Sequence, residues 1–135
     1  MPSLKKIHKK IKEQEIIEHL IEAINLYTPS YQEAPIISQF VNILQDEGVA
    51  VQLQAVPDPQ GQQNRANIIV NLGPPPPKLL WVGHLDTVKL WYDTDHEARP
   101  VNERIYGLGS SDMKGGCVAA LQTILALHRS GVNLQ

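Results

Sequence analysis

The sequence predicts a layered α/β domain whose sheet is incomplete at its C-terminal end. Three observations predict this fold class: helical periodicity over residues 13–47, strand patterns in the middle of the chain, and a further helical pattern near the end. The 135 residues suffice for one domain and are too few for two. Few strands are predicted, and no pattern after the last helix would cover the far edge of the sheet.

The first part of the chain divides into a basic tail and two helices. Residues 1–12 carry five of the 12 positive charges, so we expect an exposed tail there and the domain over residues 13–135. Apolar residues at helical spacing predict a first helix over residues 13–26, which Pro29 ends. The same spacing predicts a second helix over residues 31–47.

The second helix carries both a start signal and a stop signal. Ser30 and Glu33 have the spacing of a capping box, in which the two side chains bind the free backbone N–H groups of the first turn. Gly48 stands where a helix C-cap is expected.

Strands are predicted in the middle of the chain. Alternation over residues 49–55 indicates a half-buried strand at a sheet edge, and residues 68–70 form a second strand. Residues 58–64 are polar and predict a loop, whereas the prolines over 74–77 predict a stiff connector outside any sheet interior. The continuous apolar run over residues 79–83 predicts a central strand that is buried on both faces.

The last third of the chain leads through loops into a third helix. We expect a loop over residues 89–102, a short strand over 104–106 and a glycine-rich turn over 107–116. The helical spacing of apolar residues predicts a helix over residues 114–130, with Gly131 as its C-cap.

Charge and cysteine content exclude several classes of function. The formal net charge of −2 argues against nucleic acid as the main partner. Cys117 is the single cysteine, so an intrachain disulfide and a four-cysteine zinc site are both excluded, and we expect the reducing cytoplasm as the location. The basic start lacks the apolar region of a secretory signal, and no run of about 18 apolar residues predicts a membrane span.

Three side chains are candidates for chemistry: His84, Asp86 and Asp112. His84 and Asp86 follow the C-terminal end of the expected central strand, where ligands gather in open α/β sheets. Residues i and i+2 of an extended chain point to the same side, and metal-bound imidazoles usually donate their other N–H to a carboxylate or carbonyl. Taken alone, His-x-Asp is a weak signal, and an Asp at a helix start is normally a cap.

Two motifs together carry a family resemblance. Residues 83–88 (GHLDTV) followed by residues 106–116 (YGLGSSDMKGG) resemble the two N-terminal signatures of the M20 metallopeptidases. This family includes acetylornithine deacetylases, succinyl-diaminopimelate desuccinylases and aminoacylases. Residues 67–69 also resemble the family's strand before the histidine. The resemblance extends from the first helix onward and implies a layered α/β/α catalytic domain of the zinc-exopeptidase type.

The resemblance also implies roles for the three candidates. His84 would bind one zinc ion, Asp112 would bridge two metal ions, and Asp86 would be the catalytic-site carboxylate that orients His84. Two zinc ions are implied, with cobalt or manganese as possible substitutes. In the family, the metal pair activates a water for attack on an amide bond. The expected substrate is an N-acyl amino acid or a short peptide.

The sequence departs from the family pattern in what it lacks. The family's glutamate pair, its further acidic ligand, its C-terminal histidine ligand and its dimerisation domain correspond to positions beyond Gln135. Zinc sites usually use three or four protein ligands, and two are present here. We therefore expect the N-terminal fragment of a hydrolase, inactive by itself and dimeric only at full length. The alternative is a truncated, inactive remnant, or a protein that binds partners through an exposed sheet edge.

Two other functional classes fit poorly. His128 would complete the His-x-Asp…His triad of a non-haem iron oxygenase, but it falls on the third helix, and those oxygenases resemble all-β barrels. The segment 107–109 (GLG) begins like a dinucleotide fingerprint, yet Asp112 stands where glycine is required and would repel a pyrophosphate. We expect Cys117 to be a small core residue and His96 a surface residue.

Overall fold

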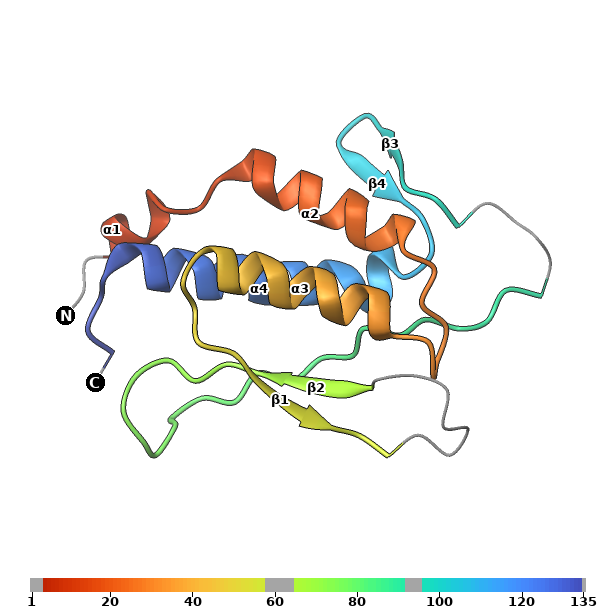
Figure 1. Ribbon diagram of the computed structural model, residues 1–135. Coiled ribbons are helices and arrows are strands. Elements are labelled where there is room, and N and C mark those ends of the chain that lie inside the picture. Colours follow the sequence, from red (N-terminus) through yellow and green to blue (C-terminus); the bar gives the residue numbers. More distant parts are fainter. Residues whose placement is uncertain (1–3, 58–64, 92–95, 135) are drawn as a thin grey trace.

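The computed structural model describes residues 4–57, 65–91 and 96–134. Helices α2, α3 and α4 form a layer on one side of the β1–β2 hairpin, and the β3–β4 hairpin lies beside the C-terminal end of α2 (Figure 1). This arrangement confirms the predicted mixed α/β class. In chain order the elements are α1 (Leu4–His8), α2 (Glu13–Asn25), α3 (Ala34–Asp46), β1 (Gln52–Ala55), β2 (Ala66–Ile69), β3 (Arg99–Val101), β4 (Arg104–Tyr106), a π-type turn (Ser110–Lys114) and α4 (Gly115–Ser130).

Helix α4 is the centre of the helical layer, and both α2 and α3 pack against it. The chain terminates this helix at Gly131, which has a φ of 59° and donates its N–H to the carbonyl of His128 at 3.1 Å. The predicted C-cap is therefore confirmed. The core between the helices is mainly aliphatic and consists of Ala23, Ile36, Phe40, Leu44, Val49, Cys117, Val118, Leu121 and Leu125.

Helix α3 begins later than the capping box predicts, at Ala34 rather than at residue 31. Neither polar side chain of the expected box caps the helix. The Ser30 hydroxyl donates to the carboxylate of Asp86 instead, and Glu33 accepts the N–H of Tyr31 at 2.9 Å. Tyr31 has a φ of 75°, which lies outside the helical region, so the helix cannot include it. At the other end, Gly48 has the positive φ that the C-cap prediction requires.

The strands among the described residues form two separate two-stranded antiparallel sheets. In the first, Gln52 pairs with Ile69 and Ala55 with Ala66; in the second, Arg99 pairs with Tyr106. The predicted strands over 68–70 and 104–106 are confirmed. The loop predicted over 89–102 contains strand β3, because its residues pair with β4 across a tight turn. The predicted half-burial is confirmed at Val49, which is 4% exposed, and at Val51, which packs against the core, but it is wrong for β1 itself, whose four residues are exposed.

The prediction for residues 79–83 is wrong. This run forms no strand, and the side chains of Leu79, Leu80 and Val82 are 81%, 80% and 72% exposed. A central strand needs a hydrogen-bonded neighbour on each side and a packed layer on each face, and the described residues supply neither. Apolar composition alone does not bury a segment.

The N-terminal residues are more regular than expected. Residues Leu4–His8 form the short helix α1, which remains largely exposed and packs against the C-terminal part of α4 (Figure 1). The loop predicted over residues 58–64 lies outside the described residues. Within the described residues, no helix combines the length and the apolar character that a membrane-spanning segment requires.

Candidate metal centre

His84 and Asp86 lie on a segment that is fastened to the connection between α2 and α3. Thr28 and Thr87 are almost fully buried, and the Thr87 N–H donates to the Thr28 carbonyl at 2.9 Å. The Thr28 hydroxyl donates to the Leu85 carbonyl at 3.1 Å. A central strand would be held by neighbouring strands; here these hydrogen bonds fix the backbone on both sides of Asp86 instead.

Asp112 lies in the glycine-rich turn that leads into α4. Gly109 has a φ of 79°, and a Cβ at this position would lie 2.8 Å from the Cγ2 atom of Thr87, so the close approach of the two segments requires glycine. The Asp112–Met113 peptide bond is cis. The turn is closed by the N–H of Lys114, which donates to the Gly109 carbonyl at 2.8 Å.

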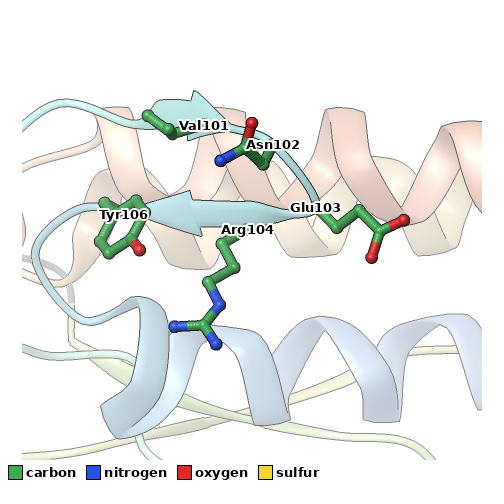
Figure 2. A pocket seen from close by; sticks show the side chains of 5 residues that line it. All are labelled: Val101, Asn102, Glu103, Arg104 and Tyr106. Atoms are coloured by element: carbon green, nitrogen blue, oxygen red, sulfur yellow. The ribbon is translucent and has the colours of Figure 1, made fainter.

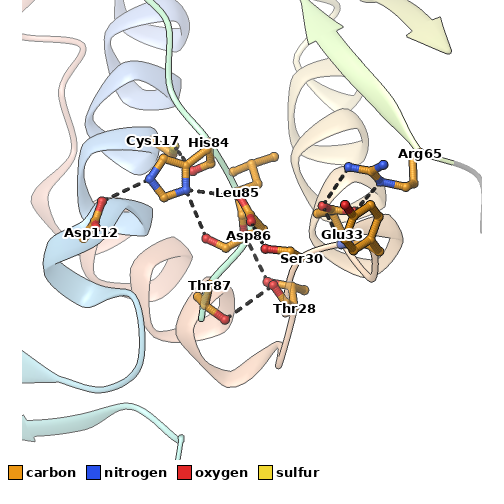
Figure 3. Close-up of polar contacts among 11 residues, drawn as sticks. Thr28, Ser30, Glu33, Arg65, His84, Leu85, Asp86, Thr87, Asp112 and Cys117 are labelled. Carbon is orange, nitrogen blue, oxygen red and sulfur yellow. Dashed lines mark hydrogen bonds and ion pairs between the residues drawn. The ribbon is translucent and has the colours of Figure 1, made fainter. Parts of the chain in front are cut away.

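The fold brings the three predicted site residues together (Figure 3). The Nε2 atom of His84 lies 3.0 Å from Oδ1 of Asp112. Its Nδ1 atom lies 3.1 Å from the backbone carbonyl oxygen of Asp86 and 3.2 Å from Oδ1 of the Asp86 carboxylate. The imidazole is therefore held between the two carboxylates, with one nitrogen facing each.

The two carboxylates beside His84 favour the protonated, positively charged form of its imidazole. Partial burial acts to lower the pKa of His84, but the hydrogen bond to Asp112 and the interactions with Asp86 outweigh it and raise the pKa above its usual value. The side chain of Asp112 is 87% exposed, so its carboxylate points into solvent apart from the contact with His84. Two carboxylates around one imidazole attract any cation that reaches them.

A buried lysine supports the turn, and sequence reasoning missed it. Lys114 is 1% exposed, and its Nζ atom donates to the carbonyls of Ala23 at 2.8 Å and Leu26 at 2.6 Å. The Ala23 carbonyl belongs to the last turn of α2 and the Leu26 carbonyl to its C-cap residue, where carbonyls lack intrahelical partners. Burial lowers the pKa of Lys114 to about 8. The only sequence signal was a cationic residue inside the glycine-rich motif.

The donor set suits zinc, as part of a larger site. An imidazole nitrogen and a carboxylate oxygen are both common zinc ligands, and these two converge to 3.0 Å. The hydrogen bond of the other ring nitrogen is typical of metal-bound histidines, because it fixes the tautomer. Among the described residues, no group of three or more His, Cys, Asp or Glu side chains is arranged to hold a metal ion. His84 and Asp112 therefore fit two positions of a coordination sphere that needs further ligands.

The other candidate residues have structural positions. Cys117 is buried, its Sγ atom donates to the His84 carbonyl at 3.1 Å, and burial raises the pKa of its thiol, as expected for a core residue. His128 is exposed and lies about 16 Å along α4 from Cys117 at 1.5 Å per residue, which excludes the oxygenase triad. His96 is partly exposed, and its Nε2 atom lies 3.3 Å from the Asn25 carbonyl oxygen.

A separate hollow of about 670 Å³ lies on the β3–β4 hairpin (Figure 2). Its lining comes entirely from the hairpin and includes the side chains of Asn102, Glu103 and Arg104. None of the three predicted site residues lines it. The candidate functional site is therefore the cluster of His84, Asp86 and Asp112 rather than this hollow.

Sequence comparison places the chain near a known group of enzymes. Residues 80–135, which contain all three site residues, match the sequence profile of peptidase family M20/M25/M40. An acetylornithine deacetylase of Vibrio cholerae is 36% identical over 84 residues, which cover 59% of this chain and 21% of that protein. An acetylornithine deacetylase of Edwardsiella ictaluri is 31% identical over 100 residues, covering 70% of this chain and 25% of that protein.

Structural comparison agrees with the sequence match. The fold is similar to that of human carnosine dipeptidase 1, with a TM-score of 0.64 and 23% sequence identity. The similarity covers 93% of this chain and 31% of the dipeptidase, and at this identity it establishes the fold alone. The chain spans between a fifth and a quarter of the length of the curated relatives described above.

Proposed function

We propose that this chain, which belongs to the M20/M25/M40 peptidase family, is the N-terminal part of a zinc-dependent amidohydrolase. The observation that carries the proposal is the convergence of His84 Nε2 and Asp112 Oδ1 to 3.0 Å within the segment that matches the family. A histidine with one ring nitrogen facing a carboxylate that orients it, and the other nitrogen beside a second carboxylate, has the arrangement of a metal-binding histidine.

His84 and Asp112 would hold the metal in this proposal. The Oδ1 atom of Asp112 faces His84, while its Oδ2 atom has no hydrogen-bond or ion-pair partner among the described residues. Asp112 would therefore have a carboxylate oxygen to offer each of two ions. When bound, zinc supplies a Lewis acid that polarises a carbonyl group and lowers the pKa of a water.

Asp86 would act through His84. Its carboxylate and its backbone carbonyl both face Nδ1 of His84, so they would keep the proton on that nitrogen. The lone pair of Nε2 would then be available to bind the metal. The buried Thr28–Thr87 bonds hold the backbone of Asp86 in place for this task.

The proposed reaction is hydrolysis of an amide bond in an N-acyl amino acid or a short peptide. The names of the relatives support this substrate class, because one is a deacetylase of acetylornithine and the other a dipeptidase of carnosine. A general base is needed in addition to the metal, and none of the three site residues has that role in this proposal.

Zinc titration of the chain tests the metal assignment. We expect Zn²⁺ to shift the side-chain ¹H–¹⁵N signals of His84 in NMR spectra, and Asp112→Ala to abolish that shift because it removes one of two ligands. Asp46→Ala is the matched control, since Asp46 is exposed at the end of α3. Unchanged zinc binding by Asp112→Ala would contradict the assignment.

Asp86→Asn tests the role given to Asp86. The amide preserves the shape of the side chain but removes its charge, so we expect zinc affinity to fall about 10–100-fold without being abolished. An unchanged affinity would mean that Asp86 does not support His84.

One observation favours the alternative of an inactive interaction protein. The apolar run over residues 79–83 is exposed, and no backbone hydrogen bond of these residues is found within the described part of the chain. Such a segment can pair with another strand. The coding sequence past the codon for Gln135 separates the two: an open frame with a glutamate pair and further acidic and histidine ligands supports the hydrolase, and an immediate stop supports the alternative.

A further inference from the structure

The carboxylate of Asp86 is held from two sides. Its Oδ1 atom lies 3.2 Å from Nδ1 of His84, and its Oδ2 atom accepts a hydrogen bond from the hydroxyl of Ser30 (Figure 3). The side chain of Asp86 is 30% exposed, so without a second partner the carboxylate would be free to rotate toward solvent. The Ser30 hydroxyl therefore determines which way Asp86 faces.

Ser30 is itself fixed by its surroundings. Its N–H donates to the Thr87 carbonyl at 3.2 Å, next to the parallel bridge between Pro29 and Thr87. The segment that carries His84 and Asp86 and the segment that carries Ser30 are thus bonded through their backbones. A hydroxyl on such a segment keeps its position even though its side chain is exposed.

The turn that follows Ser30 is braced by an ion pair. Glu33 accepts the N–H of Tyr31 at 2.9 Å and two hydrogen bonds from Arg65, at 3.0 Å and 3.2 Å. The Arg65 guanidinium also stacks over the ring of Tyr31, 4.7 Å from its centroid. Because the Arg65 and Glu33 side chains are only 19% and 12% exposed, the pair is shielded from solvent and restrains the turn.

We propose that Ser30 is a positioning residue of the metal centre, which locks the Asp86 carboxylate against His84. The inference rests on the proposed metal site, and it assigns to the Thr-Pro-Ser connection between α2 and α3 a role beyond ending one helix. Ser30 touches neither the metal ligands nor the reacting atoms; it acts only through Asp86.

The test compares Ser30→Ala with Ser30→Thr and with Ser38→Ala. The threonine variant keeps the hydroxyl, whereas Ser38→Ala removes an exposed hydroxyl that bonds the Ala34 carbonyl within α3. The first readout is the χ1 rotamer of Asp86 from three-bond NMR couplings, measured without metal. We expect a single rotamer in the wild type, in Ser30→Thr and in Ser38→Ala, and rotamer averaging in Ser30→Ala.

The second readout is the zinc affinity of the same four proteins. We expect Ser30→Ala to weaken zinc binding about 3–10-fold, less than the loss expected from removing the direct partner of the histidine. Ser30→Thr and Ser38→Ala should keep the wild-type affinity. A single Asp86 rotamer in Ser30→Ala, or a Ser30→Thr variant that behaves like Ser30→Ala, would overturn the proposal. If the wild type binds no zinc, the proposed function fails, while the rotamer of Asp86 still decides the role of Ser30.

Discussion

Helix α4 and the run over residues 79–83 are both strongly apolar, yet the apolar side chains of α4 are buried and those of the run are exposed. On α4, the side chains of Val118, Leu121 and Leu125 are 1%, 2% and 0% exposed. On the run, most side chains face solvent. The helix has α2 and α3 packed on it, whereas the described residues provide no neighbouring strand for the run.

The difference shows that burial depends on available partners as much as on composition. A helix satisfies its own backbone hydrogen bonds and needs only one packed face. A central strand needs neighbours for its backbone and a layer on both faces. The helices therefore have their packing partners among the described residues, and the apolar run that precedes His84 does not.

The largest expected effect comes from opening the core of α4. Leu125→Ala leaves a cavity at a fully buried position, so we expect the free energy of unfolding to fall by about 3 kcal/mol. Urea denaturation followed by circular dichroism measures the change. Leu80→Ala is the matched control, and at an 80% exposed position it should change stability by no more than about 0.5 kcal/mol. Equal losses of stability in Leu125→Ala and Leu80→Ala would contradict the conclusion that α4 is packed in the core and the run over residues 79–83 is not.

A smaller effect is expected from the buried lysine that joins the start of α4 to the C-terminal end of α2. Lys114→Met preserves the length of the side chain but leaves the Ala23 and Leu26 carbonyls without their donor. We expect a loss of about 2 kcal/mol in the free energy of unfolding. Lys89→Met, at an exposed position, is the control in the same denaturation experiment. A stability equal to wild type would show that water replaces the ammonium group at these carbonyls.

The smallest effect concerns an ion-pair cluster at the far end of the helical layer. Arg129 on α4 donates to Glu47 at 2.5 and 2.9 Å and to Glu15 on α2 at 2.7 Å. The hydrogen bond from Arg129 outweighs burial and lowers the pKa of Glu47. For Glu15, burial acts to raise the pKa, but the bonds from Arg129 and Lys12 prevail and lower it.

The sign of the pH effect follows from these lowered pKa values. The cluster stabilises the folded chain above the usual glutamate pKa of about 4.5, and this contribution is lost as the pH falls through the lower folded values. Glu47→Gln should therefore cost about 1 kcal/mol at pH 6 and progressively less toward pH 3, as measured by denaturation across that range. Asp46→Asn, at the exposed neighbouring position, should show no such trend. A cost for Glu47→Gln that stays constant with pH would contradict the assignment.

The sequence predicted those elements whose signals are local. The limits of α2 and α4 follow from helical spacing and from the glycine after α4, and the structure agrees closely. The capping box failed because Ser30 and Glu33 have stronger partners elsewhere, 56 and 32 residues away in the chain. The run over 79–83 failed because strand formation depends on partners that no local pattern reports.

The site was predicted in part for the same reason. The His84–Asp86 contact follows from spacing of i and i+2, and the approach of Asp112 follows from the family resemblance. The contributions of Ser30 and Lys114 depend on contacts across 56 and 91 residues, which the sequence does not reveal. The structure therefore adds most to the sequence analysis where a hydrogen bond joins a polar side chain to a residue that is distant in the sequence.

The bond between the Thr28–Ser30 connection and the segment around Thr87 has a kinetic consequence. It joins residues up to 59 positions apart, so a loop of that length must close before the two segments meet. Loop closure costs chain entropy that only the completed contact repays, whereas helices form from neighbours within one turn. The individual helices can thus form early, whereas the cluster around His84 forms only after this closure and after the packing of α4 on α2, which joins residues up to 114 positions apart. Cation capture by this chain would then stabilise the last step of folding rather than guide the first.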